Sequence, residues 1–313
     1  MVWTIVAMLF AGSAAAQDFK VTLLGTGSPN PLFERFGMST LVEAGSEKLV
    51  FDVGRGSTIR LWQAHVPLGS VTATFISHFH SDHTVGIPDL WLTGWIQRPF
   101  GMRKGPFVIY GPKGMTAMMA DLQRAYAADI AIRSVDEKDP LEGVAVEAHD
   151  HDEGVIYAKN GVKVTAITVD HGDVIKPAFG WRVDYGGRSV VLSGDTRYSP
   201  HLIEAAKGAT LLIHEVSAAT PDMLAQSEIA TAIFAHHTSP QQAGQVFGQT
   251  GPKLAVYSHL VLIGDATHAP PSLDELVRQT RETYAGPLVV GSDLMQFDVR
   301  QDEVRVTDPP KTR

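Results

Sequence analysis

Seven consecutive residues decide how this chain is interpreted: Ser77-His78-Phe79-His80-Ser81-Asp82-His83. They follow an apolar, β-branched run at 73–77 that is typical of a buried strand. Three imidazoles and a carboxylate this close together are costly to bury unless something neutralises or coordinates them. Zn²⁺ binds imidazole nitrogen and carboxylate oxygen at about 2 Å, so the segment predicts a metal site at a strand end. The alternative is a solvated histidine-rich loop, which the apolar flanking segments disfavour.

Short strands alternate with amphipathic helices along the rest of the chain. Apolar, β-branched runs that end in Gly or polar residues predict the strands. These are 21–25, 48–54, 73–78, 106–111, 162–169, 189–194, 210–215, 253–259 and 287–293. The predicted helices are 57–65, 88–97, 114–127, 200–207, 221–234, 240–249 and 273–284. Buried strands with helices between them predict a layered α/β fold, and the acidic stretch 134–154 is expected to be a loop.

Composition limits the chemistry of any site. The chain has 313 residues, of which 44% are hydrophobic, enough for a sizeable core. It has no cysteine, which excludes thiolate metal sites, Fe–S clusters and disulfides, so a metal must be held by carboxylates and some of the 13 histidines. The net charge of −8 argues against a surface that holds long nucleic acid, because phosphate contacts need clustered Lys and Arg.

The first sixteen residues differ from the rest. Residues 1–16 carry no charged side chain, and an apolar run passes into small residues that end at Ala14-Ala15-Ala16. This layout predicts a secretory signal peptide and a periplasmic or secreted protein. The apolar run is about half the ~20 residues of a membrane span, so no stable membrane anchor is expected. The alternative is an alanine-rich terminus. Residues 17–313 contain no linker and are expected to form a single hydrolase domain.

Several motifs together resemble one family. They are LLGTGSPNP at 23–31, LVFDVGRGS at 49–57, ISHFHSDHTVGIPDL at 76–90, VDHGD at 169–173, SGDTRYS at 193–199, LLIHEVSAAT at 211–220 and HHTSP at 236–240. The HxHxDH signature resembles the metallo-β-lactamase superfamily, and the other motifs resemble its ribonuclease Z and arylsulfatase-like branch. The resemblance spans nearly the whole chain after residue 16. It implies a four-layer αββα sandwich with a two-metal site on one edge.

The resemblance also implies which residues bind metal. Two Zn²⁺ ions are expected, with Mn²⁺ or Fe as alternatives. His78, His80 and His171 would hold the first ion, Asp82, His83 and His259 the second, and Asp195 would bridge them. His171, Asp195 and His259 each follow a β-rich run, where several loops can converge on one edge. This argument for the three positions does not depend on the resemblance. The alternative for Asp195 is that it is an ordinary turn aspartate. Asp52, which also follows a predicted strand, either orients a ligand histidine or stabilises its own turn.

Two adjacent dications would supply a bridging hydroxide as nucleophile and stabilise a transferring phosphoryl or sulfuryl group. His214-Glu215 resembles the His-Glu motif of this branch. We therefore predict His214 as the general acid, Glu215 as the residue that tunes it, and Asp82 as a further catalytic residue. The alternative is that His214 only hydrogen-bonds Asp82. His237 matches a motif histidine whose role the sequence does not define.

The sequence favours a small-molecule substrate over nucleic acid. The short interval between His171 and Asp195 lacks the arm with which ribonuclease Z enzymes clamp tRNA. With the acidic charge and the predicted export, this favours an exported sulfate or phosphate ester hydrolase of the arylsulfatase or phosphodiesterase type. The alternative is a 3′-tRNA processing endonuclease of the ribonuclease Z type. A lactonase or β-lactamase and a non-catalytic metal-binding protein are less favoured, and a homodimer is compatible with the sequence.

Other polar and aromatic clusters are weaker candidates. The run 149–153 is rich in His, Asp and Glu, but it is expected to be a solvated loop. Trp91 and Trp95 lie four residues apart, so they either form an aromatic wall for an aryl substrate or, as we favour, pack in the core. The remaining histidines are expected to be surface or capping residues: His65, His201, His236 and His268.

Overall fold

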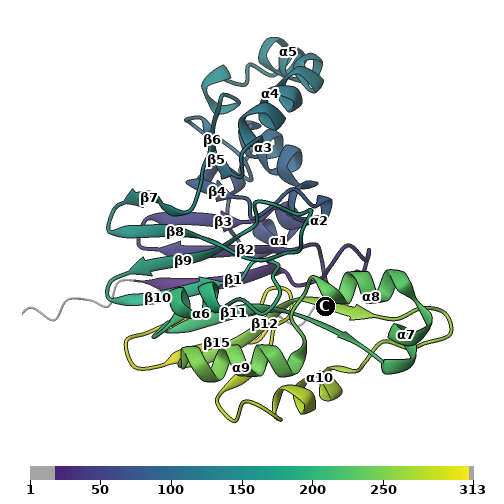
Figure 1. Ribbon diagram of the computed structural model, residues 1–313. Coiled ribbons are helices and arrows are strands. Elements are labelled where there is room, and N and C mark those ends of the chain that lie inside the picture. Colours follow the sequence, from purple (N-terminus) through teal and green to yellow (C-terminus); the bar gives the residue numbers. More distant parts are fainter. Residues whose placement is uncertain (1–17, 310–313) are drawn as a thin grey trace, which may run out of the picture.

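Two β-sheets form the centre of the protein (Figure 1). The computed structural model describes residues 18–309, so the predicted signal peptide at 1–16 lies outside the described residues. The first sheet has the order β15-β14-β1-β2-β3-β4-β5-β6. Its strands are β1 (Phe19–Gly25), β2 (Ser39–Ala44), β3 (Glu47–Phe51), β4 (Ala73–Phe75), β5 (Phe107–Gly111), β6 (Val146–Asp150), β14 (Gln296–Val299) and β15 (Val304–Thr307).

The second sheet has the order β13-β12-β11-β10-β9-β8-β7. Its strands are β7 (Gly154–Lys159), β8 (Val162–Thr168), β9 (Phe179–Tyr185), β10 (Arg188–Leu192), β11 (Leu211–Ala219), β12 (Leu254–Ile263) and β13 (Leu288–Val290). Apolar side chains from both sheets meet between them. Phe51 and Phe75 of the first sheet stack with ring centroids 4.9 Å apart, and both contact Trp181 of the second. Burial of such side chains stabilises by roughly 1.5–3 kcal/mol each, which holds the sheets face to face.

Helices cover the outer face of each sheet, and the predicted αββα sandwich is confirmed. One apolar cluster joins the first sheet to α1 (Ser57–Gln63), α3 (Ile87–Trp95) and α4 (Met115–Ala125). Another joins the second sheet to α6 (Pro200–Ala206), α9 (Pro240–Thr250) and α10 (Leu273–Thr280). In Figure 1, α3 and α4 lie in the upper part of the molecule, and α9 and α10 lie at the bottom. Within residues 18–309, no helix is long and apolar enough to cross a membrane.

Trp91 and Trp95 belong to the core of the first helical layer. Both are fully buried, and their indole N–H groups donate to the backbone carbonyls of Val144 (2.9 Å) and Pro140 (2.7 Å). A buried indole needs such a hydrogen-bond partner. The two residues therefore form core packing, as we favoured, rather than a wall for substrate.

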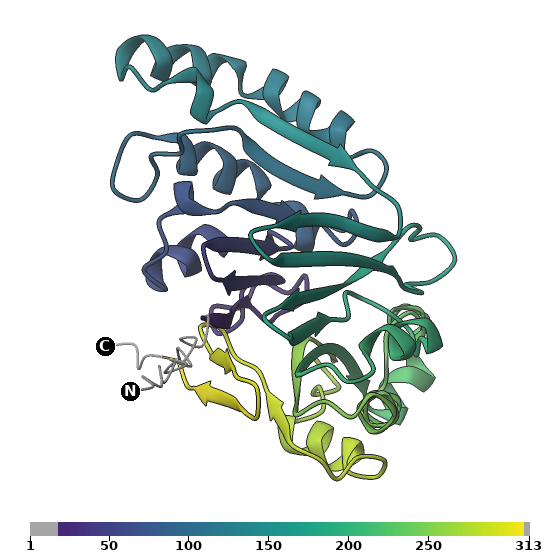
Figure 2. The ribbon, with the colours of Figure 1, turned by 90° about the vertical axis from the view of Figure 1, so that its left-hand side faces the viewer.

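Several parts of the secondary structure differ from the sequence prediction, which did not include β2, β7 or the helix α5 (Ala127–Asp136). The expected loop at 134–154 contains the edge strand β6, which pairs in parallel with β5. The single helix predicted at 221–234 is two, α7 (Pro221–Gln226) and α8 (Glu228–Ala235), because Ser227 breaks the helix and its hydroxyl caps α8. The C-terminal strands β14 and β15, yellow in Figure 2, extend the first sheet beside the N-terminal β1.

Strand direction places the polar loops together. Strands β3, β4 and β5 run parallel, as do β10, β11, β12 and β13. Parallel strands have their carboxyl ends on the same edge of a sheet, which is where ligands bind in layered α/β folds. The loops that follow β3, β4, β8 and β10 therefore meet at one edge of the sandwich.

Candidate metal centre and its pocket

The loops after β3 and β4 are locked together by one carboxylate. Asp52 follows β3, and its oxygens accept from the backbone N–H (2.7 Å) and hydroxyl (2.9 Å) of Ser77, which follows β4. The same carboxylate accepts from Nδ1 of His83, at 2.9 Å. His83 lies on the one-turn helix α2 (Ser81–Thr84). Asp52 therefore orients His83 and leaves its Nε2 directed into the site, which favours the ligand-orienting alternative.

Three histidines form the first half of the cluster. His78 and His80 come from the loop after β4, and His171 comes from the loop after β8. Nδ1 of His80 lies 3.4 Å from Nε2 of His171. Nδ1 of His171 donates to the backbone carbonyl of His236 at 3.0 Å, which fixes the direction of its ring. With Asp195, these residues form a group whose ligand atoms all lie within 4.8 Å of one another.

Two histidines and an aspartate form the second half. Nε2 of His259 lies 3.2 Å from Nε2 of His83 and 3.2 Å from Oδ2 of Asp82. The ladder between β11 and β12 is interrupted next to His259, which has a φ of 46°. Asp52 also has a positive φ, 57°. Strained backbone of this kind costs of order 1–3 kcal/mol per residue and is concentrated at functional sites.

One oxygen of Asp195 joins the two halves. Its Oδ2 lies 3.9 Å from Nε2 of His78 and 3.6 Å from Nε2 of His171 in the first half. It also lies 3.3 Å from Nε2 of His83 and 3.4 Å from Nε2 of His259 in the second. Gly194, with a φ of 58°, forms the turn that delivers this carboxylate, and a Cβ there would lie 2.2 Å from the Phe179 carbonyl oxygen.

The cluster fits a pair of metal ions. Donor atoms about 2.0–2.1 Å from a shared tetrahedral zinc stand roughly 3.3 Å apart, close to most of the separations above. Nε2 of His78 and Oδ1 of Asp195 are buried and lack any hydrogen-bond partner in the protein. Unpaired buried polar atoms are rare and costly. Bound cations would satisfy the histidine nitrogens and balance the two aspartates.

The electrostatics favour the same interpretation. Burial, reinforced by His83, holds the pKa of His78 well below its ordinary value, and burial also lowers the pKa of His171. Neutral imidazole is the form that binds a metal. Burial alone would lower the pKa of His83, but the carboxylates of Asp195 and Asp52 raise it well above its ordinary value. A positive charge is therefore stabilised beside His83, and a divalent cation would supply it.

Asp52→Asn should weaken metal binding without removing any ligand. The change removes the charge that holds Nδ1 of His83 and the Ser77 loop, and loss of such a partner typically costs 10–100-fold in metal affinity. Titration against a competing chelator measures the change. Asp139→Asn is a matched control, because Asp139 is equally buried and accepts the Gln97 backbone N–H away from the cluster. Equal affinities in both variants would assign Asp52 to its own turn alone.

A pocket of about 340 Å³ opens over the cluster. His80, Asp82, Asp195 and His259 form its polar floor. Its other lining residues are Ser28, Pro29, Asn30, Ile233, His236, His237, Val261, Leu262, Ile263 and Gly264. His236, expected to be a surface or capping residue, is the C-cap of α8 and lies half-buried in the pocket wall, stacked on His237 with ring centroids 5.0 Å apart.

His237 is the titratable pocket residue with a carboxylate partner outside the metal cluster. Its Nδ1 lies 3.3 Å from Oε2 of Glu215. The other oxygen of Glu215 accepts the backbone N–H groups of Thr196 (3.2 Å) and Thr238 (2.9 Å), so the carboxylate is fixed. Burial lowers the pKa of His237, but the charge of Glu215, its hydrogen bond with the ring and the charge of Asp195 together raise this pKa to about 9. His237 therefore carries a proton at neutral pH.

His214, the residue predicted as general acid, lies elsewhere. It is buried, its Nδ1 donates to the Glu215 carbonyl at 2.6 Å, and its ring stands edge-on to Phe247 of α9. It does not line the pocket over the cluster. Successive strand residues face opposite sides, so His214 and Glu215 cannot both face the site. Which of the two faces the site depends on the register shift between His214 and Val216, and no sequence pattern reveals that shift.

The acidic run at 149–153 forms no metal group among the described residues. His149, in β6, pairs with Glu147 on the surface at 2.9 Å. His151 packs its ring on Phe179, with centroids 4.6 Å apart. The run is thus partly strand, and its histidines make local contacts.

Comparison with known proteins agrees with this geometry. The model of the Beta-lactamase superfamily domain matches residues 50–260, which include all seven predicted metal ligands. Ribonuclease Z of Mycobacterium marinum is 31% identical over 280 residues, covering 90% of this chain and 98% of that protein. The chain belongs to the metallo-β-lactamase superfamily, in its ribonuclease Z branch.

Two further relatives of this superfamily are similar over most of the chain. Ribonuclease Z of Mycobacterium avium is 34% identical over 285 residues, covering 90% of this chain and 98% of that protein. The crystal structure of the short form of human tRNase Z superposes with a TM-score of 0.64 at 22% identity, covering 90% of this chain and 99% of that chain. At that identity the superposition supports the fold alone.

These relatives contradict the main functional prediction, an exported hydrolase of small sulfate or phosphate esters. The curated relatives are named ribonuclease Z and match along nearly their whole length. Because 280 aligned residues make up 98% of the M. marinum protein, that ribonuclease Z is no longer than this chain. A short interval between His171 and Asp195 is therefore no argument against the ribonuclease Z class. The expectation that nucleic acid is an unlikely partner loses its support for the same reason.

Proposed function

We propose that this protein is a metal-dependent endonuclease of the ribonuclease Z type that cleaves a phosphodiester bond at the 3′ side of precursor tRNA. The likeness to proteins named ribonuclease Z supports the substrate. The observation that carries the chemistry is the position of Oδ2 of Asp195 within 3.9 Å of histidines from both halves of the cluster. A bridging carboxylate is what a two-metal phosphodiesterase requires.

We assign seven residues to two zinc ions, with Asp195 shared. His78, His80 and His171 hold one ion, and Asp82, His83 and His259 hold the other. Bound in this way, the ions lower the pKa of water and stabilise charge on a transferring phosphoryl group.

The chain's own residues supply the proton transfers. Asp82 lines the pocket floor, where its carboxylate can accept a proton from the attacking water. His237 lines the wall beside His259, with ring centroids 5.8 Å apart. Glu215 holds His237 by Nδ1, which leaves Nε2 as the atom that donates a proton to the leaving oxygen. We therefore assign the general acid to His237 and its orientation to Glu215.

Purified, zinc-loaded protein should release the 3′ trailer from precursor tRNA and should leave p-nitrophenyl sulfate intact. A chelator should abolish cleavage, because the cluster cannot polarise water without its cations, and added Zn²⁺ should restore it. Denaturing gel electrophoresis of end-labelled precursor measures the cut, with mature tRNA as the control substrate. Hydrolysis of the sulfate ester without any cut in the precursor would contradict the proposal.

A further inference from the structure

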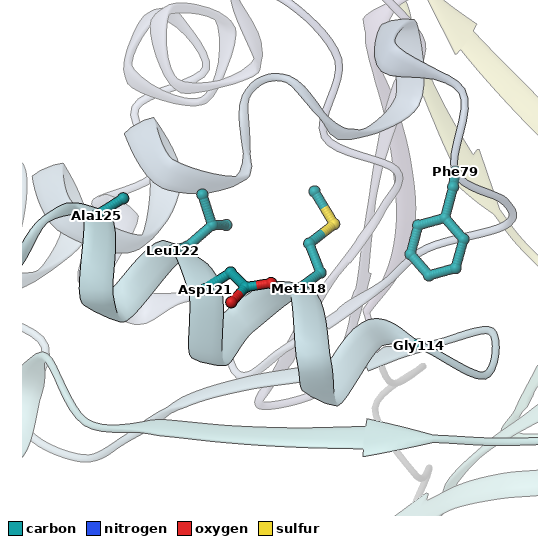
Figure 3. A pocket seen from close by; sticks show the side chains of 6 residues that line it. All are labelled: Phe79, Gly114, Met118, Asp121, Leu122 and Ala125. Atoms are coloured by element: carbon teal, nitrogen blue, oxygen red, sulfur yellow. The ribbon is translucent and has the colours of Figure 1, made fainter.

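A second hollow, of about 520 Å³, adjoins the loop that carries the first two histidines of the cluster. Phe79, between His78 and His80 in sequence, forms one side of it, and α4 forms the other. Figure 3 shows Met118 and Leu122 projecting from α4 on the side where the Phe79 ring lies. The complete lining is Phe79, Gly114, Met118, Asp121, Leu122 and Ala125.

The ring of Phe79 is exposed on the side that faces the hollow. It is 43% exposed and belongs to none of the hydrophobic core clusters of the described residues. Gly114 has a φ of 114°, and a Cβ built on it would lie 3.6 Å from two ring carbons. A glycine here therefore leaves the ring accessible. The two histidines on either side fix the backbone of Phe79, so its ring is held in place beside the cluster.

Resting on the proposed function, we propose that this hollow binds a nucleobase of the RNA strand next to the scissile phosphate, stacked on Phe79. Phe79 directly precedes His80, which lines the floor of the pocket over the cluster, and neighbouring Cα atoms are 3.8 Å apart. A strand whose phosphate lies at the cluster passes this hollow within one or two nucleotides. The hollow is lined mainly by apolar side chains, which suit the flat face of a base.

The charge of the protein supports stacking as the means of binding. With 26 Lys and Arg against 34 Asp and Glu, the chain has no excess of cations to hold the phosphate backbone. Stacking on aromatic side chains binds single-stranded RNA without base preference and without net charge. At the hollow itself, Asp121 pairs with Arg124. Lys113, exposed next to Gly114, adds a positive charge at the rim where the backbone would pass.

Phe79→Ala should raise KM for precursor tRNA about 10-fold, within the range of losing one stacked base, with a smaller change in kcat. Phe79→Trp should restore KM, because it replaces the aromatic face. Phe79→Leu fills the space without that face and should remain impaired. Trp62→Ala is the matched control: Trp62 is 50% exposed in a different hollow that contains no cluster residue, and its loss should not change KM.

A second readout locates the base. Single 2-aminopurine substitutions on either side of the cut should identify one position whose fluorescence is quenched on binding to zinc-loaded wild-type protein, in stopped-flow mixing before cleavage. The quench should be lost in Phe79→Ala. Metal content measured in each variant separates this effect from damage to the neighbouring ligands.

The possible results separate the two proposals. If wild-type protein leaves precursor tRNA uncut, the proposed function fails. If wild-type protein cuts it and Phe79→Ala, with its metals in place, has an unchanged KM, only the base site fails. Restoration of KM by Phe79→Leu would also overturn the base site, because Phe79 would then merely fill space. A variant that changes the oligomeric state but not KM would assign the hollow to a second copy of the chain.

Discussion

Asp195→Ala is expected to lose most of its metal, from about two ions per chain in the wild type, and nearly all cleavage of precursor tRNA. The physical reason is that Oδ2 of Asp195 lies 3.3–3.9 Å from four histidine nitrogens that belong to both halves of the cluster. Its removal takes away a ligand and a negative charge from both ions at once. Elemental analysis of dialysed protein gives the metal content.

Two variants make this experiment decisive. Asp195→Asn keeps the shape and removes the charge, so it should retain more metal than the alanine variant but less than the wild type. Asp184→Ala removes a carboxylate that pairs with Arg182 and Lys163 on the second sheet, and it should keep its full metal content. Thermal unfolding in chelator should show Asp195→Ala as stable as metal-free wild type. Full occupancy in Asp195→Ala would refute the shared position of this carboxylate.

The sequence predicts the framework of the fold because the central strands are fully buried. Runs such as 189–194 and 253–259 have apolar, partly β-branched centres, and both form strands next to the site. The edge strand β6 is missed because its residues are half-exposed and polar, so that Val146–Asp150 has the composition of a loop. Strand β14 pairs with β1, and β15 pairs with β14, so the sheet is completed by a contact between distant parts of the chain that no local pattern reveals.

Six of the seven predicted cluster residues come together because they follow strands that end at the same edge, whereas His259 lies within β12 at the interruption of its ladder with β11. The sequence could not identify the residues that form the walls of the pocket over the metal cluster. His236 and His237 follow α8, which reaches the site only through the packing of α7 and α8 on the ends of β11 and β12. His214 was predicted as the general acid because it matches a family motif. The directions of the His214 and Glu215 side chains depend on the interruption of the β11–β12 ladder beside Glu215.

The substrate was misjudged for a different physical reason. A net charge of −8 describes the whole chain, but a single catalytic centre with two dications supplies its own attraction for one phosphodiester. Global charge therefore limits the length of RNA held by ionic contacts without excluding RNA as a substrate.

His237→Ala should reduce kcat for precursor tRNA by about 10²–10⁴-fold, the usual contribution of a general acid, while it keeps its metals. The ring lies in the pocket wall with Nδ1 3.3 Å from Glu215, so its loss removes the proton donor and no proposed ligand. Glu215→Gln should cause a smaller loss, because the amide keeps the shape but no longer favours the protonated ring. Rapid-quench kinetics of precursor cleavage measures both.

Leaving-group dependence then separates His237 from His214. A departing oxygen of high pKa needs a proton, whereas p-nitrophenolate departs without much help. His237→Ala should therefore be impaired far more on phosphodiesters with alkyl or phenyl leaving groups than on bis-p-nitrophenyl phosphate. His214→Asn, which keeps a donor for the Glu215 carbonyl, should show the same modest change on all of them, because its ring packs on Phe247 outside the pocket. An equal loss on every ester in His237→Ala would mean that His237 positions the substrate, and a steep dependence in His214→Asn would return the acid to His214.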